Sequence, residues 1–267
     1  MCQLLGMNSA DATSFSFCFK GFCGRGGGVD GKNADGWGLA IYEGQGLRTF
    51  LDVEACTKSP VAKFVQDYPT RTQNMMAHIR CATHGRVGLE NVHPFSRELW
   101  GIPWCFVHNG DAPAFAHQRA GHHVVLGGKA VEGHLVHHAI GDTDSEAIFC
   151  AILNAIHAEF QELPSLPVLY TSLRRLLHEL VQDDKTVINN FLLGCGPSTL
   201  FCYSWPGQRP GSDVWNGLYY ILRHSPAVSG TNSQMADTEY TIDFDPAQHR
   251  MAIVATKPLT DERAGPK

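Results

Sequence analysis

The sequence lacks several features that would place it in familiar classes of protein. No apolar run reaches the roughly 18 residues of a membrane-spanning helix. The start, Met-Cys-Gln-Leu-Leu-Gly, has neither the basic region nor the cleavage site of a signal peptide. Lys and Arg form no cluster dense enough to follow a phosphate backbone, and the formal net charge is -5. We therefore expect a soluble protein without a membrane segment or a nucleic-acid partner.

Cysteines are present, but not in the patterns that would make them structural. The chain has nine, an odd number, and no two of them form a CxxC pair. This spacing disfavours both a disulfide framework and a cysteine-rich zinc module. Reduced thiols in a cytoplasmic protein fit the pattern best.

The length and composition predict one domain that spans residues 1–267. With 267 residues, of which 43% are hydrophobic, the chain can bury a sizeable core. Short β-prone runs bounded by Gly, Pro, Asn or Asp predict strands over 37–42, 47–53, 74–81, 104–108, 188–194, 199–205, 218–223, 239–244 and 251–256.

Two segments in the middle of the chain have the periodicity of amphipathic helices. The first covers 145–163, with isoleucines four residues apart and Thr143 or Asp144 as its N-cap. The second covers 169–180, and Pro164 and Pro167 separate it from the first. Strands, then two helices, then strands again predict an α+β fold, because regular alternation of strand and helix is missing.

Two stretches predict loops. Residues 21–38 are so rich in glycine that they predict a loop with special backbone angles. Within it, residues 26–33 nearly match the phosphate-binding P-loop motif, but Asn33 stands where that motif has the Ser or Thr that holds magnesium. Residues 112–133 are polar and predict an exposed excursion with no core of its own. The roles of both stretches stay open.

The second residue, Cys2, carries a thiol and, if Met1 is removed, also a free α-amino group. An α-amine titrates near pH ~8 and a thiol near ~8.5, so one residue can hold both an attacking sulfur and its base. This arrangement is a variant of the catalytic triad in which the α-amine, rather than a neighbouring histidine, serves as the base. Cys2 is therefore a candidate nucleophile.

Further motifs are consistent with this interpretation. They are MCQLLG at the start, DGWG at 35–38, AHIRCATHGRVGLENVHPF at 77–95, FVHNG at 106–110 and DTDSE at 142–146. Together they resemble the glutaminase domain of class II glutamine amidotransferases, which are N-terminal-nucleophile hydrolases with a processed terminal cysteine. The resemblance covers most of the chain and implies a four-layer αββα sandwich, with two antiparallel sheets flanked by helices.

The resemblance also implies roles for particular residues in binding glutamine. Arg80 would bind the α-carboxylate, because its guanidinium can form two parallel hydrogen bonds to a carboxylate. Asp144 would face the α-ammonium, with Asp142 as the competitor if the register is shifted. Thr83, His84 and Gly85 would line the glutamine pocket through backbone groups and the Thr83 hydroxyl. The side chain of His84, like those of His78, His93 and His108, is expected to be structural rather than a general base.

Asn109 and Gly110 are the expected oxyanion donors. The Asn side-chain amide and the Gly N–H would stabilise the charge that develops when sulfur attacks the δ-carbonyl, at about 3 kcal/mol for each donor. The implied reaction is a two-step acyl transfer through a Cys2 thioester that water hydrolyses, and it requires no cofactor or metal. The substrate is glutamine or a γ-glutamyl compound.

Two other functions remain open. The tail from Thr256 to Thr260 looks like that of stand-alone family members, so a separate protein could accept the ammonia that this chain releases. A less favoured alternative is a metal-binding protein that uses His122, His123, His134, His137 and His138. The sequence does not predict the oligomeric state.

Overall fold

The structure is a computed structural model, and it describes residues 2–17, 22–27, 33–68, 70–83, 85–116, 125–127, 135–182, 186–205, 211, 213, 215–224, 233–236, 240–244 and 250–258. Its strands are β1 (Gln3–Phe17), β2 (Trp37–Glu43), β3 (Gly46–Asp52), β4 (Arg71–Ile79), β5 (Phe95–Leu99), β6 (Ile102–Asp111), β7 (Ile188–Cys195), β8 (Thr199–Tyr203), β9 (Tyr219–His224), β10 (Ser233–Ala236), β11 (Tyr240–Phe244) and β12 (Arg250–Ala255). Its helices are η1 (Cys23–Arg25), α1 (Pro60–Gln66), η2 (Leu89–Asn91), α2 (Pro113–Ala116), α3 (Asp144–Glu159) and α4 (Leu166–Gln182).

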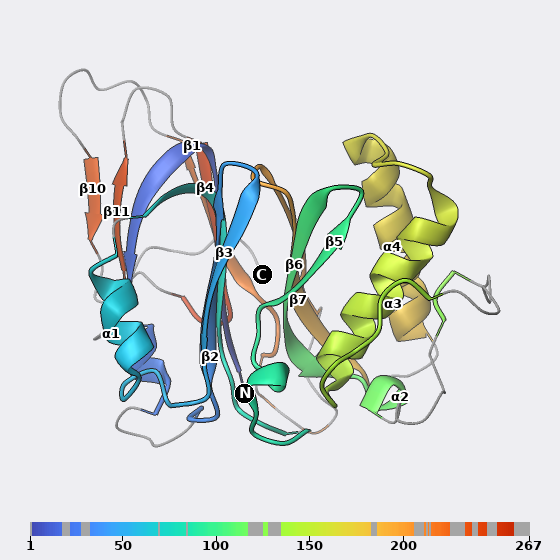
Figure 1. The fold of residues 1–267 in the computed structure, drawn as a ribbon, viewed down its shortest axis with the longest axis horizontal. Helices are drawn as coiled ribbons and strands as arrows, with labels where there is room; N and C mark the ends of the chain where they lie inside the picture. The colour runs from blue at the N-terminus through green and yellow to red at the C-terminus, as the bar shows by residue number, and fades with distance from the viewer. Residues whose placement is uncertain are drawn as a thin grey trace.

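The described strands form two antiparallel sheets that stack face to face (Figure 1). The larger sheet has eight strands in the order β10-β11-β1-β4-β2-β3, and β12 joins it between β1 and β9. The smaller sheet has the order β5-β6-β7-β8. Helix α1 lies outside the larger sheet, and α3 and α4 cover the outer face of the smaller one. The predicted αββα sandwich is confirmed.

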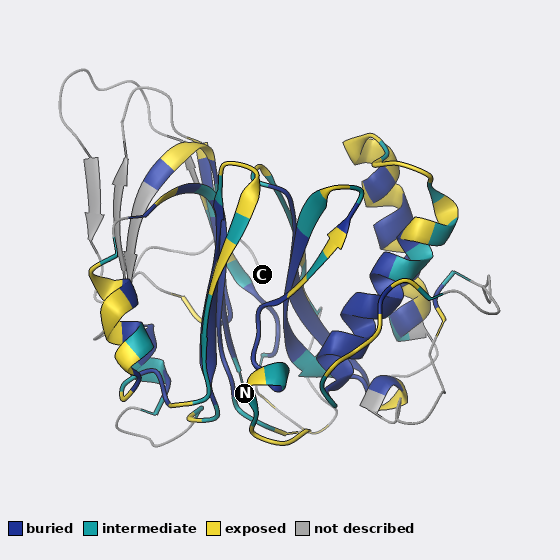
Figure 2. Ribbon diagram, viewed as in Figure 1, coloured by how far each residue is buried: buried dark blue, intermediate teal, exposed yellow. Residues whose placement is uncertain are grey.

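Buried apolar residues form three clusters, and the buried strands occupy the centre of the molecule (Figure 2). Between the sheets, Leu4 and Met76 pack with Val107 and Leu192. A second cluster fills the space between the smaller sheet and helices α3 and α4, and a third includes residues of the larger sheet and of α1. Among the described helices, none combines the length and apolar character needed to cross a bilayer.

Each predicted strand coincides with a strand of the structure, but β1, β5, β10 and the short helices α1 and α2 were missed. The segment of β1 is rich in small and polar residues, and pairing with β4, β11 and β12 makes it a strand despite this composition. The start of α1 does carry a signal, because Ser59 accepts a hydrogen bond from Ala62 N–H and Pro60 is the first helical residue.

Three local predictions need correction. Helix α3 ends at Glu159 rather than at 163, and its N-cap is Thr143, so Asp144 is its first residue. Pro167 does not separate the helices, because it is the second residue of α4. Residues 112–133 were predicted to have no core, yet Phe115 and Leu126 are buried in the helical layer. Residues 117–124 and 128–134 lie outside the described part of the chain.

Gly38 on β2 shows how closely the segment before Pro94 packs on the larger sheet. A Cβ at Gly38 would lie 2.2 Å from the carbonyl oxygen of His93, far inside van der Waals contact. We therefore expect Gly38→Ala to lower the free energy of unfolding by about 2 kcal/mol or more in denaturant titrations. Gly46→Ala on β3 is the matched control, because its nearest contact would be an ordinary 3.5 Å. Equal stability of the two variants would contradict this packing argument.

Candidate active site

Cys2 lies directly before β1, and the register of β1 with β4 places it beside the end of β4. Gln3 pairs with Ile79, so Cys2 stands opposite Arg80, which follows that strand. The Cys2 Sγ accepts a hydrogen bond from the Cys81 N–H at 3.2 Å, and its thiol donates to the Cys81 carbonyl at 3.4 Å. The predicted nucleophile and the predicted carboxylate ligand are thus neighbours.

Burial controls the protonation of the Cys2 thiol. It raises the pKa of Cys2 to about 11, while the hydrogen bond to the Cys81 backbone and the positive charge of Arg80 act in the opposite direction. A thiol with this pKa is protonated at neutral pH. Attack on a substrate therefore requires a base that removes the thiol proton, or further stabilisation of the thiolate.

This elevated pKa gives a measurable pH dependence. In protein whose intact mass still includes Met1, we expect alkylation of Cys2 by iodoacetamide to accelerate about tenfold per pH unit up to about pH 10. The reason is that only the thiolate reacts, and its fraction keeps growing until the pH reaches the pKa. Mass spectrometry of the Cys2 peptide measures the rate. A plateau near pH ~8.5, where an unperturbed thiol titrates, would contradict the burial argument.

Arg80 is held at the end of β4 and is only 3% exposed. Its backbone N–H donates to the Gly36 carbonyl at 2.8 Å, and its guanidinium Nη1 donates to the Arg86 carbonyl at 3.0 Å. The side chain of Asn91 donates to the same Arg86 carbonyl, and also to Asp142 Oδ1 at 2.6 Å. The loop after Arg80 is therefore tied to the segment that leads into α3.

Asn109 and Gly110 lie near the end of β6, in the smaller sheet. They pair with Asn190 and Asn189 of β7, and the Asn190 side chain donates to the Asn109 carbonyl at 3.2 Å. A Cβ at Gly110 would lie 2.0 Å from the Ile188 carbonyl oxygen, so this position has room only for glycine. The backbone of the predicted oxyanion pair is therefore closely constrained.

Asp144 is 5% exposed, and backbone donors occupy both of its carboxylate oxygens. Oδ2 accepts from the Ala112 N–H at 2.9 Å, and Oδ1 accepts from the Ser145 N–H at 2.8 Å. Asp144 thus joins the residue after β6 to the start of α3. Its rival Asp142 is half-buried, and its carboxylate accepts hydrogen bonds from Asn91 and from the Arg86 N–H.

Three buried histidines accompany the predicted site residues: His78 lies on β4 two residues before Arg80, His108 precedes Asn109 on β6, and His93 packs against His78. The rings of His78 and His93 are 4.1 Å apart, and His108 Nδ1 lies 2.8 Å from the Ser145 hydroxyl. Burial lowers the pKa of His78 to about 3 and also lowers that of His93 and His108, so all three are neutral near pH 7. This state agrees with a structural role.

The same histidines link the two halves of the site electrostatically. The Arg80 charge helps to lower the pKa of His78 and His93, whereas the Asp144 charge opposes the lowering at His108. The structure thus places the Cys2 sulfur against the backbone next to Arg80, and the histidines respond to the charge of Arg80 at His78 and His93 and to that of Asp144 at His108.

The structure gives fewer contacts for the other residues predicted to line the pocket. Thr83 is exposed, and His84 lies outside the described residues. Gly85 has φ +73°, and a Cβ there would lie 2.6 Å from Asp142 Oδ1, which explains the glycine.

Among the described residues, no group of three or more His, Cys, Asp or Glu side chains could hold a metal ion. His122, His123 and His134 lie outside that part of the chain, as do residues 28–32 of the P-loop-like stretch.

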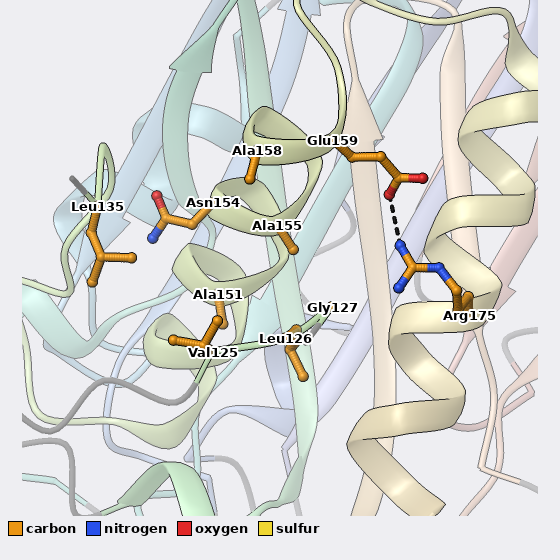
Figure 3. A pocket seen from close by; sticks show the side chains of 10 residues that line it. All are labelled: Val125, Leu126, Gly127, Leu135, Ala151, Asn154, Ala155, Ala158, Glu159 and Arg175. Carbon is orange, nitrogen blue, oxygen red and sulfur yellow. Dashed lines mark hydrogen bonds and ion pairs between the residues drawn. The ribbon is translucent and has the colours of Figure 1, made fainter. Parts of the chain in front are cut away.

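A cavity of about 270 Å³ lies elsewhere, in the helical layer (Figure 3). It is lined by residues of α3, by Arg175 of α4, by Leu135 and by the segment 125–127. Glu159 and Arg175 form an ion pair of 2.7 Å at one side of it. The cavity contains none of the predicted site residues, and we assign it no part in the chemistry.

The chain is similar to known proteins over almost its whole length. The family model described as class-II glutamine amidotransferases matches residues 1–265. A protein of Escherichia coli K12 named "Putative glutamine amidotransferase YafJ" is 34% identical over 265 residues, which covers 97% of this chain and 91% of that protein. A Haemophilus influenzae protein named "Putative glutamine amidotransferase" is 33% identical over 270 residues, and this match covers 100% of this chain and 81% of that protein.

A solved structure shows the same fold. It is described as a predicted glutamine amidotransferase from Pseudomonas aeruginosa PA01, and it matches with a TM-score of 0.66 and 31% identity. The match covers 98% of this chain and 91% of that one.

Proposed function

Because the chain belongs to the class II glutamine amidotransferase family, we propose that it hydrolyses the side-chain amide of glutamine or of a γ-glutamyl compound, with Cys2 as nucleophile. The observation that carries this proposal is the contact of the Cys2 sulfur with the backbone next to Arg80. It brings the proposed nucleophile close to the proposed carboxylate ligand, which supports hydrolysis of an amino-acid amide at this end of the larger sheet.

Removal of Met1 precedes the reaction and frees the α-amine of Cys2. This amine takes the thiol proton while the sulfur attacks the amide carbon, and it thereby supplies the base that the raised thiol pKa requires. Arg80 binds the substrate α-carboxylate and Asp144 faces the α-ammonium. The negative charge that develops on the amide oxygen is stabilised by the Asn109 side-chain amide and the Gly110 N–H.

The tetrahedral intermediate then collapses. The α-ammonium of Cys2 returns its proton to the leaving nitrogen, the C–N bond breaks, and ammonia or an amine departs. A γ-glutamyl thioester remains on Cys2. Water then attacks this thioester and gives a proton to the same α-amine. The C–S bond breaks, glutamate is released, and the Cys2 sulfur takes the proton back to restore the thiol.

The substrate class can be tested with purified protein whose N-terminus is Cys2. It is incubated separately with L-glutamine, glutathione and other γ-glutamyl amides, and released glutamate is quantified. L-Asparagine is the matched control, because it is shorter by one methylene and should give no product. We expect glutamate from at least one γ-glutamyl substrate. Its absence from all of them would contradict the proposal.

The same assay distinguishes the two forms of the proposal. Preference for glutamine, with release of free ammonia, would favour an ammonia donor that works with a separate synthase. Preference for a substituted γ-glutamyl amide would favour hydrolysis of a small molecule as the complete reaction. The comparison of kcat/KM between glutamine and glutathione separates them.

A further inference from the structure

The turn that follows β4 is held on one side by Asp35, the first residue of the DGWG motif. The Asp35 N–H donates to the Arg80 carbonyl at 3.3 Å, and the Asp35 Oδ2 accepts from the Ala82 N–H at 2.8 Å. One residue therefore uses both its backbone and its side chain to hold this turn. Gly36, next in the motif, has φ +112°, and its carbonyl accepts the Arg80 N–H.

The groups that Asp35 holds belong to the two peptide units that contact the Cys2 sulfur. The Arg80 carbonyl and the Cys81 N–H are opposite ends of one planar trans peptide. The Cys81 carbonyl and the Ala82 N–H are opposite ends of the next. In each unit Asp35 binds one end, and the Cys2 sulfur binds the other, at 3.2 Å and 3.4 Å.

This arrangement fixes the orientation of both peptide units relative to Cys2. A planar peptide that is anchored at one end can turn its other end only by breaking the anchor. Hydrogen bonding at the carbonyl also polarises the peptide, so the Cys81 N–H becomes a better donor to the sulfur. The contact with the Cys81 backbone lowers the pKa of Cys2 against the effect of burial.

We propose that Asp35 is a positioning residue that orients the Arg80–Ala82 backbone toward the Cys2 sulfur and thereby stabilises its reactive form. The inference rests on the proposed role of Cys2 as nucleophile. It gives the first residue of the DGWG motif a task in the reaction, although Asp35 acts through residues 80–82 and touches no reacting atom.

The test measures the reactivity of Cys2 without any substrate. Wild type, Asp35→Ala and Asp35→Asn are alkylated with iodoacetamide at about pH 8, and the rate at Cys2 is followed by peptide mass spectrometry. Asp35→Ala keeps the backbone N–H that binds the Arg80 carbonyl and removes the carboxylate that anchors the Ala82 N–H, so the variant tests the side-chain anchor alone. We expect loss of this anchor to loosen the turn and the contact of its Cys81 N–H with the sulfur, so that Cys2 reacts about tenfold more slowly, which corresponds to a rise of about one unit in the thiol pKa. Asp35→Asn keeps an oxygen that can accept from Ala82 and should react within about twofold of wild type.

Asp52→Ala is the matched control, because Asp52 is also a carboxylate that accepts a loop N–H, that of Glu54 at 3.1 Å. It should lose stability in thermal unfolding without any change in the Cys2 rate. If Asp35→Ala does not fold, Asp35→Glu replaces it, since its carboxylate is displaced by one methylene. The same slowing is expected for Asp35→Glu.

The outcomes separate this inference from the proposed function. Wild-type reactivity in folded Asp35→Ala would overturn the positioning role, even if the wild-type enzyme releases glutamate. Loss of reactivity in Asp35→Asn equal to that in Asp35→Ala would also overturn it, because a side-chain oxygen that can accept from the Ala82 N–H would then not preserve the reactivity of Cys2. Slow alkylation in Asp35→Ala, with no glutamate from any substrate, would support the positioning role and contradict the function.

Discussion

Replacement of Cys2 by alanine should abolish amide hydrolysis, with kcat reduced at least about a thousandfold and the fold retained. The sulfur is the only group that can form the proposed thioester, and alanine keeps the α-amine but removes the nucleophile. The Cys2 thiol is buried, but Cys2 lies outside β1 and the substitution removes only its sulfur, so we expect the fold to be retained. Glutamate release and circular dichroism measure the two effects.

Cys202→Ala is the matched control for a thiol outside the site. Cys202 is exposed on β8, in the smaller sheet, and its loss should leave hydrolysis at the wild-type level. Substantial glutamate release by purified Cys2→Ala would contradict the assignment of the nucleophile. Unfolding of that variant would show that Cys2 stabilises the fold more than its contacts indicate.

Replacement of Asn109 by alanine should reduce kcat by about a hundredfold to a thousandfold and leave KM little changed. The side-chain amide is proposed to donate to the oxygen only when that oxygen becomes negative, so its loss affects the transition state more than substrate binding. Steady-state kinetics on the preferred substrate separates the two constants.

Asn154→Ala gives a comparison at a structural asparagine. Its side chain accepts from the backbone of Val136 and His137 in the helical layer, far along α3 from Asp144. This variant should lose stability but keep its kcat. A wild-type kcat in Asn109→Ala, or a change confined to KM, would remove Asn109 from the oxyanion role.

Most of the fold could be predicted because its strands carry local signals. Alternating or continuous apolar runs bounded by turn residues mark β2, β6 and β7, and helical periodicity marks α3 and α4. The long strand β1 could not be found in this way. Its small and polar residues become a strand through pairing with β4 on one side and with β12 and β11 on the other, which depends on distant parts of the chain.

The site could be predicted where it depends on the chemistry of single side chains. The thiol of Cys2 indicates a nucleophile by itself, the motif around Arg80 indicates a carboxylate ligand through its resemblance to the family, and the register of β1 with β4 brings the two residues close together. The role of Asp35 was missed because it depends on hydrogen bonds between backbone groups of two segments. Such contacts follow from strand register, and the composition of either segment does not reveal them. The DGWG motif was the available signal.

The same reason explains the missed bridge between Asn91 and Asp142. An asparagine in a loop is compatible with many structures, and its two hydrogen bonds to Asp142 become visible only when both loops are placed. The helix start at Asp144 was easier to predict, because capping by Thr143 is a local interaction with Glu146 N–H.

The most direct measurement is to label the protein with a diazo-ketone analogue of glutamine and to locate the adduct by peptide mass spectrometry. Such an analogue alkylates the group that attacks the amide carbon. We predict one adduct, on the sulfur of Cys2, in a peptide that begins at Cys2 because Met1 has been removed. An adduct on another cysteine, or full hydrolytic activity in protein that retains Met1, would contradict an N-terminal nucleophile.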